Sequence, residues 1–454
     1  MRLLQLPLLL ALSATLSAQA QSLAELGARA LAADPAVQAA AASLRAAEQR
    51  LYQARAAYGP TANITVTTNQ TRYREEPANE LRPFQSGQSA LQLSQPLWRG
   101  ALYPALQAAR SQVEQADSAL LQARIESQQR LGEALLEVFK ARDVLAHADA
   151  LRKAQSEQLA SVRRSFQVGR AAAPELREAE ARLDNAQAQW LGADGEADLR
   201  QQVLAEVGAG GLPDISGLLA RALATEALPP LQAASVLDWL SRAEADSPQL
   251  RQARLALDAA DAETRKATLA HAPTLDLNYS VTRSNDTGTV TSIFPRRGSA
   301  SALGATLTIP LFASGATQSK VAESLALRDK AQGELGLARR TLVIGVRQAF
   351  AATLSTLSQA RALATAERSQ ALSLRANQRG YEVGIKTNAD VLDASAKLFE
   401  ARRDHSRARH DAWAGYFRLR ALSGALNETD LHSLDAQLVA HLGAEIAGLR
   451  KAAP

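Results

Sequence analysis

Two short stretches of sequence decide the fold: residues 61–67, which read TANITVT, and residues 274–281, which read TLDLNYSV. In both, apolar residues occupy every second position and polar residues occupy the positions between them. A period of two is typical of a β-strand with one apolar face and one polar face. We therefore predict strands at about residues 61–72 and 274–283.

The two stretches belong to two copies of one longer unit. Three short motifs recur 213 to 215 residues later in the same order: PT at 60–61 and 273–274, QPLW or IPLF at 95–98 and 309–312, and VG at 168–169 and 383–384. Because both order and spacing are kept, we interpret residues 21–210 and 235–426 as two structural repeats. In each repeat the hydrophobic period predicts a helix, two strands, a very long helix and a return helix.

The second strand of each repeat is expected at about residues 88–97 and 302–311. Strands of about ten residues with one apolar face suit a transmembrane barrel with a wet lumen, whereas two isolated hairpins would make a poor soluble sheet. Four strands per chain cannot close a barrel, because the smallest single-chain barrels have about eight. We therefore predict a trimer with twelve strands. The polar connections at about 68–88 and 283–301 are expected to be extracellular loops.

The long helices are expected at residues 101–167 and 316–382, each of them about 100 Å long at 1.5 Å per residue. Their leucines and valines recur at coiled-coil spacing between charged residues, so these helices should pack on one another. Gly169 and Gly384 each follow a long helix and should supply the left-handed residue of a hairpin turn. Return helices are expected at 174–207 and 388–422.

The N-terminus carries a predicted secretory signal at residues 1–20. Arg2 precedes an apolar run at 3–16, and Ala18-Gln19-Ala20 suits signal peptidase. There is no cysteine, hence neither a disulfide nor a thiol for a lipid anchor. Beyond the signal no uncharged stretch of 18 residues is also apolar throughout, because the longest uncharged run, residues 298–319, alternates apolar with polar residues and contains Pro310. This excludes a helical inner-membrane transporter.

Composition and motifs argue against an enzyme and against a nucleic-acid-binding protein. The formal charge is +5, but the basic residues are interspersed with acidic ones and form no patch. The six histidines show no metal-ligand spacing, and there is no Gly-rich phosphate loop. We therefore expect no catalytic site, metal or cofactor, and we expect the histidines to lie on solvated helix faces.

At residues 380–394 the sequence reads GYEVGIKTNADVLDA, and at 311–315 it reads LFASG. These stretches resemble the second helical turn and a strand-to-helix junction of the TolC family. The resemblance covers essentially the whole mature chain. It implies a mainly α protein with a β-barrel contribution: a homotrimer with a 12-stranded barrel in outer-membrane lipid, an α-helical barrel through the periplasm, and an equatorial part built from 211–234 and 427–454.

The resemblance also implies a function and partners. Family members are passive ducts for type I protein secretion or drug efflux, opened by an inner-membrane ABC or RND-type transporter and its periplasmic adaptor protein. The missing lipidation cysteine and the motif at 390–393 look more like the secretion-linked branch. The alternative is a periplasm-spanning structural coiled coil anchored in the outer membrane. A periplasmic adaptor also has long helical hairpins, but it needs lipoyl-type β domains that the sequence lacks.

Two aspartates fall on the family's pore constriction, namely Asp390 and Asp393. The competing interpretation is helix capping, because Asp390 lies three residues after Thr387 at the start of a return helix. The first repeat carries Glu175 and Glu178 at the same spacing. Only the first residue of each pair is placed to cap, which weakens the pure capping interpretation.

Three residues fall on positions that hold the family's periplasmic end closed: Tyr381, Lys386 and Glu175. Here Lys386 stands where the family has an arginine, so a bidentate guanidinium is replaced by a point charge. Pro174 stands where the family has a hydroxyl, so that hydrogen bond cannot form. The alternative is that these side chains are ordinary packed or solvated residues beside a turn, or, for Glu175, a first-turn charge that favours the helix dipole.

Overall fold

The computed structural model describes residues 23–75, 80–169, 172–208, 228–229, 231, 235–288 and 294–426. The predicted signal peptide at 1–20 and the predicted C-terminal equatorial tail at 427–454 lie outside the described residues. So does nearly all of the predicted equatorial segment at 211–234. The chain divides into two compact units, one formed by 1–40, 120–248 and 339–454 and the other by 41–119 and 249–338.

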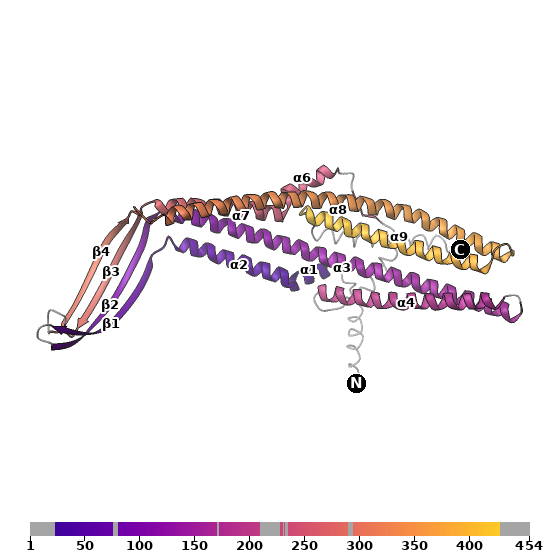
Figure 1. The fold of residues 1–454 in the computed structure, drawn as a ribbon, viewed down its shortest axis with the longest axis horizontal. Helices are drawn as coiled ribbons and strands as arrows, with labels where there is room; N and C mark the ends of the chain where they lie inside the picture. Colours follow the sequence, from indigo (N-terminus) through magenta and orange to yellow (C-terminus); the bar gives the residue numbers. More distant parts are fainter. Residues whose placement is uncertain are drawn as a thin grey trace, which may run out of the picture. The chain divides into compact units, whose positions relative to one another are not determined.

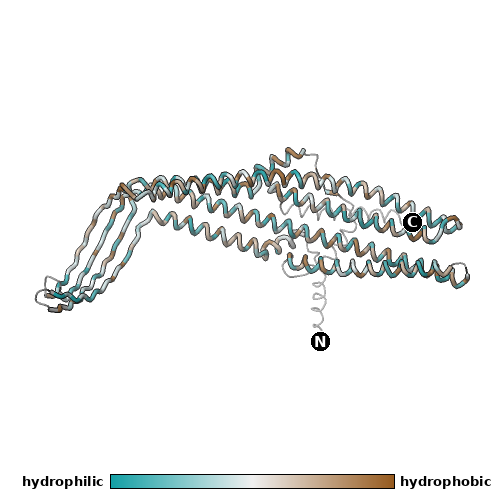
Figure 2. The backbone as a smooth tube through the Cα atoms, in the orientation of Figure 1, coloured by the Kyte–Doolittle hydropathy of each residue, from teal (hydrophilic) through white to brown (hydrophobic). Residues whose placement is uncertain are grey.

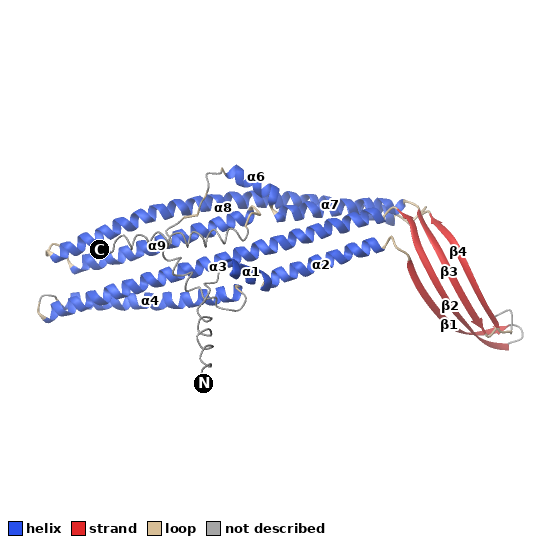
Figure 3. Ribbon diagram, turned by 180° about the vertical axis from the view of Figure 1, so that it is seen from behind, coloured by secondary structure: helices blue, strands red, loops and turns tan. Residues whose placement is uncertain are grey.

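One unit contains a four-stranded antiparallel sheet in the order β1-β2-β3-β4 (Figures 1 and 3). Its strands are β1 (Thr61–Glu75), β2 (Glu80–Arg99), β3 (Thr274–Asp286) and β4 (Arg296–Thr308). The two predicted hairpins, one from each repeat, are joined by pairing between β2 and β3. That ladder is interrupted by a bulge between Pro96 and Trp98, where proline has no N–H to donate.

The register of the ladders places the paired leucine, isoleucine and valine residues of all four strands on one face. Residues directly opposite one another share a face of the sheet. One row across the sheet is Ala62, Leu93, Tyr279 and Leu303, and the adjacent row on the opposite face is Asn63, Gln92, Ser280 and Ala302. On the apolar face Ile64 is 75% exposed and Leu303 is 72% exposed. Within one chain this apolar face is therefore uncovered.

The strands differ in extent from those predicted. β2 begins at Glu80 and β4 at Arg296, so most of residues 68–88 and 283–301 are strand and not the predicted loops. The apolar alternation fades there, but backbone pairing does not depend on side-chain polarity and continues. β4 ends at Thr308 and not at 311, shortly before Pro310, whose nitrogen cannot join a ladder.

The helices repeat in the same order in both halves of the chain. They are α1 (Leu23–Ala33), α2 (Pro35–Ala56), α3 (Leu102–Gln167), α4 (Ala173–Val207), α6 (Val236–Asp246), α7 (Pro248–Thr268), the short η1 (Leu269–His271), α8 (Ala316–Glu382) and α9 (Asn388–Leu422). Figure 2 shows apolar and polar residues interspersed along them. None of the described helices is both long enough and apolar enough to cross a membrane.

In the other unit α3 runs beside α4, and α8 runs beside α9, so each pair forms a helical hairpin (Figure 1). α4 buries Ala179, Ala186, Ala193, Ala197 and Leu204, which follow a heptad pattern. Small residues at these positions let helices approach closely. At Gly415 of α9 an added Cβ would lie 2.8 Å from the hydroxyl of Thr353 on α8. Packing between these two helices therefore requires glycine there.

The apolar core of this unit combines α3 with α9. Leu131, Leu135 and Val138 of α3 pack with an aromatic group on α9, together with Leu204 of α4. The aromatic group is Trp413, Tyr416 and Phe417, with Trp413 and Tyr416 edge to face at 6.0 Å between ring centroids. This core packs helices of both repeats against one another. The same helices continue beyond it to the hairpin turns.

Candidate functional site

The hairpin turns of the two repeats use the same backbone device. Gly169 and Gly384 have φ angles of +72° and +76°, in the left-handed region that favours glycine. The N–H of Gly384 donates to the carbonyl of Tyr381 at 3.0 Å, and that of Gly169 donates to Phe166 at the same distance. Each long helix therefore ends by satisfying its last carbonyls in a tight reversal.

The second turn is closed further by Gly380. Its carbonyl accepts from the N–H groups of Ile385 at 2.8 Å and of Lys386 at 3.1 Å. An added Cβ at Gly380 would lie 2.7 Å from Cγ of Lys386, so the lysine stem packs directly over this glycine. Gly380 therefore positions Lys386. Gly380 lies inside the motif at 380–394, but the sequence alone does not reveal this role, because the contact depends on how the turn folds back.

Asp390 closes a capping box at the start of α9. One oxygen of its carboxylate accepts from the N–H of Thr387 at 2.9 Å and from its hydroxyl at 3.0 Å, while the Thr387 hydroxyl accepts from the N–H of Asp390 at 3.3 Å. The other oxygen lies 3.9 Å from Nζ of Lys386. The hydrogen bonds from Thr387, with the charge of Lys386, lower the pKa of Asp390 below its ordinary value.

The first turn lacks this cap. α4 starts after Ala172, which has no side chain able to accept a hydrogen bond, and Pro174 lies in its first turn. Glu175 follows in the same turn, near the positive end of the helix dipole. The two repeats therefore share the glycine reversal and differ in how the return helix begins.

Asp393, one turn beyond Asp390, pairs with an arginine of the other hairpin. Nη1 of Arg182 on α4 lies 2.7 Å from Asp393, and Nη2 of the same guanidinium lies 2.8 Å from Glu178. Partial burial lowers the pKa of Arg182, but the hydrogen bonds to Glu178 and Asp393 outweigh it and leave a net increase. The spacing of four residues between Glu178 and Arg182 is visible in the sequence, but the contact across helices is not.

A second contact between the hairpins lies close to this one. The side-chain amide of Gln158 on α3 donates to the side-chain oxygen of Asn388, the first residue of α9. Within one chain, the start of α9 is therefore tied to both helices of the first hairpin.

The predicted gate residues lie around the same turns. Tyr381 is in the last turn of α8 with 37% of its surface exposed, and Glu175 is in the first turn of α4. Within the described chain Lys386 pairs with Asp390 and not with Glu175. Contacts of these residues between subunits, and the pore position of both aspartates, stay predictions.

A buried polar cluster joins α3 to α9 farther from the turns. Asp143 of α3, with only 5% of its side chain exposed, accepts hydrogen bonds from Ser406, from Arg409 at 3.2 Å and from His410 at 2.9 Å. Burial raises the pKa of Asp143, but the contacts with His410, Ser406 and Arg409 outweigh burial and bring it below the ordinary value. The charged form of Asp143 is therefore the favoured one.

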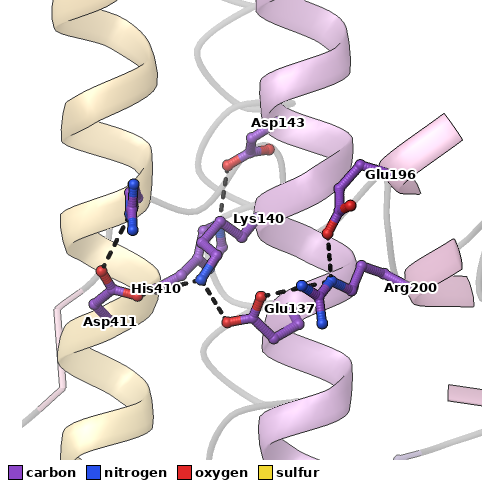
Figure 4. A network of polar contacts seen from close by, with 8 residues as sticks. Glu137, Lys140, Asp143, Glu196, Arg200, His410 and Asp411 are labelled. Carbon is purple, nitrogen blue, oxygen red and sulfur yellow. Dashed lines mark hydrogen bonds and ion pairs between the residues drawn. The ribbon is translucent and has the colours of Figure 1, made fainter. Parts of the chain in front are cut away.

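More exposed ion pairs extend the cluster onto α4 (Figure 4). Lys140 of α3 contacts Glu137 on its own helix and Asp411 of α9 at 3.5 Å. Arg200 of α4 lies 2.7 Å from Glu196 and 4.0 Å from Glu137. Charged side chains from three helices thus meet at one level.

The prediction that the histidines lie on solvated helix faces is wrong for His410 and His405, which take part in helix packing. His410 is buried against Asp143, and His405 lies 2.8 Å from Glu367 of α8. Burial lowers the pKa of His147. In the described part of the chain, no three side chains of His, Asp or Glu converge in the manner of metal ligands.

Comparison with known proteins matches both repeats to one family. Residues 26–209 and 239–425 match the outer membrane efflux protein family. The chain belongs to that family. Outer membrane efflux proteins are channels and not enzymes, and they lie in the cell outer membrane and extend into the periplasm. The resemblance to the TolC family is thereby confirmed, as is the mainly α fold with antiparallel strands.

Individual relatives span nearly the same length. The outer membrane protein TolC of Vibrio cholerae is 28% identical over 423 residues, which cover 92% of this chain and 94% of that protein. The alkaline protease secretion protein AprF of Pseudomonas aeruginosa is 28% identical over 383 residues, covering 83% and 77%. The solved structure of CusC superposes with a TM-score of 0.76 at 18% identity, covering 89% of this chain and 92% of that one.

Asp143→Asn should destabilise this outer membrane efflux protein by about 3–5 kcal/mol, because it leaves Arg409 buried without its counter-charge. Since the pKa of Asp143 is lowered by folding, its stabilisation is present above the ordinary aspartate value of about 3.9 and is lost as pH falls through the folded value. Wild type should therefore converge on the variant in acid. Urea unfolding followed by circular dichroism measures both effects.

The matched control is Asp149→Asn, on the same helix, where the carboxylate pairs with Arg152 and Lys153 at a more exposed site. The free energy of unfolding of this variant should be close to that of wild type. If both variants lose the same free energy of unfolding, burial adds nothing to the stabilisation that Asp143 provides.

Proposed function

We propose that three copies of this chain form a passive export duct, with a 12-stranded barrel in the outer membrane and a helical barrel in the periplasm. The observation that carries the proposal is the register of the sheet, which gathers apolar side chains from all four strands on one exposed face. Such a face suits lipid, and the opposite polar face suits a wet lumen.

The number of strands supports the trimer. The described sheet has four strands, with β1 and β4 at its edges. Within lipid every backbone N–H and C=O group needs a partner, so the edges of one chain must pair with further copies. Three copies supply twelve strands, whereas two would supply only eight, which leave little room inside for cargo.

We further propose that an inner-membrane transporter and a periplasmic adaptor protein supply the energy and open the duct. In support, the family comparison identifies a channel, and a channel has no energy source of its own. AprF is by its name a secretion protein for an alkaline protease, and it matches most of this chain. We therefore favour protein secretion by an ABC-type transporter. Drug efflux with an RND-type transporter is the second candidate, consistent with the efflux family as a whole.

For the closed periplasmic end, we propose that Asp390 and Asp393 ring the constriction. Tyr381, Lys386 and Glu175 would make links that hold it shut. The capping contacts of Asp390 are compatible with this role, since a carboxylate held by Thr387 and Lys386 has a fixed position. Weak exposed links are also suitable, because a docking partner that prefers the open state can then outcompete them.

The apolar face can be tested with adjacent residues of β4 that point to opposite faces. Leu303→Arg should strongly reduce heat-sensitive trimers in the outer membrane, because an arginine facing the middle of the bilayer costs roughly 2–4 kcal/mol in each copy. Ala302→Arg places the same charge on the polar face and should assemble. Gel mobility before and after heating measures trimers. Equal assembly of the two variants, or a stable soluble monomer, would reject the membrane sheet.

The constriction can be tested by Asp390→Asn combined with Asp393→Asn. Asparagine keeps an oxygen that accepts from Thr387, so the cap survives while the charge is lost. In planar bilayers, wild type should prefer cations and be blocked by trivalent cations from the periplasmic side, and both properties should weaken in the double variant. Unchanged selectivity and block would show that these residues do not line the constriction and would leave Asp390 with its capping role alone.

The gate can be tested by Tyr381→Phe combined with Lys386→Ala. We expect a leaky duct, with larger single-channel conductance and cells more sensitive to large antibiotics, because threefold symmetry removes each link three times. Arg177→Gln, on the exposed side of α4, is the control for loss of a positive charge. If conductance and sensitivity match wild type at equal trimer levels, other residues hold the duct shut. The first turn, which contains Pro174, is then the next region to test.

A further inference from the structure

Arg182 is the one side chain that brings a positive charge directly against a predicted constriction carboxylate from the opposite hairpin within the described chain. Its Nη1 lies 2.7 Å from Oδ1 of Asp393. Its Nε and Nη2 lie 3.1 and 2.8 Å from Oε1 of Glu178, one helical turn earlier on α4. The guanidinium therefore bridges two carboxylates that belong to different repeats.

The geometry holds Arg182 in place. A planar guanidinium can point separate N–H groups at two acceptors at once, which a lysine ammonium does less specifically. Only 27% of the Arg182 side chain is exposed, against 56% for Asp393 and 46% for Glu178. The less exposed arginine thus fixes the position of the more exposed Asp393 carboxylate.

These contacts change the charge at the proposed constriction. Asp390, Asp393 and Glu178 are negative, while Lys386 and Arg182 are positive and lie within 4 Å of them. Each chain therefore carries one net negative charge there, and not the two that its aspartates alone suggest. Charges in contact lie well inside the Debye length of about 10 Å at 0.1 M salt, so a passing ion experiences their sum.

We propose that Arg182 determines ion selectivity by offsetting one of the two negative charges of Asp393 and Glu178, so that the constriction attracts cations less strongly than its carboxylates alone would. This inference rests on the proposed constriction. Asp390 has a positive neighbour of its own in the described chain, Lys386 at 3.9 Å, so the charge that Arg182 offsets is that of Asp393 and Glu178. The duct then discriminates weakly between ions, which suits a passage for large cargo of varied charge.

The test compares single-channel recordings of Arg182 variants in planar bilayers. Arg182→Gln should raise the ratio of cation to anion permeability and tighten block by hexamminecobalt(III), used as the trivalent probe, by about two- to fivefold, the range of one exposed ion pair. Arg182→Lys keeps the charge and should stay near wild type. Arg182→Met is a second neutral variant, and it carries the test if the Gln variant does not form trimers.

The matched control is Arg177→Gln, which removes a positive charge from the same helix at a site paired with Glu180 and 82% exposed. It should leave block and permeability ratio unchanged. A larger conductance without a change in selectivity in Arg182→Gln would make Arg182 a latch between the hairpins and overturn the proposal.

The experiment separates the inference from the proposed constriction. If Asp390→Asn with Asp393→Asn weakens block while Arg182→Gln matches wild type, the constriction stands and the role of Arg182 is rejected. If the aspartate variant has no effect, the constriction itself is misplaced, whatever Arg182 does.

Discussion

The rest of the structure depends on the need to pair every backbone N–H and C=O group of the sheet. Antiparallel pairing satisfies β2 and β3 on both sides, but β1 and β4 are edge strands of the described sheet. An exposed edge beside an apolar face is a template for association. The same constraint explains the duplication, because pairing of β2 with β3 doubles the number of strands per chain before any second copy is needed.

Much of the fold could be predicted because it is periodic. Alternation at 61–67 and 274–281 identifies strands, and α8 and α9 have the bounds that hydrophobic spacing and the turn around Gly384 predict. The early start of β2 could not be predicted, because the strand there is held by its partner's backbone and not by its own side-chain pattern. Arg182 was missed for a related reason. Its contact with Asp393 joins two repeats whose relative rotation no local pattern encodes.

The buried cluster around Asp143 has a different physical role from the apolar core. Alanines at heptad positions of α4 permit close packing but distinguish poorly between neighbouring registers of two long helices. A buried carboxylate facing Arg409 and His410 penalises any slip, because the charges of Asp143 and Arg409 would both lose their partners in a buried site. The alanines thus allow close packing, and Asp143 fixes the register of the helices.

The unequal turns of the two repeats bear on symmetry. Gly380, Thr387 and Asp390 stiffen the second turn, whereas the first turn begins its return helix without a side-chain cap. In the proposed trimer the two turns alternate around the ring and form a pseudo-hexagon of two kinds of vertex. A binding ring with six equal subunits would therefore meet two classes of contact, one with a preformed shape and one that can adapt. Quasi-equivalence of this kind would let the proposed threefold channel accept such a ring without exact matching.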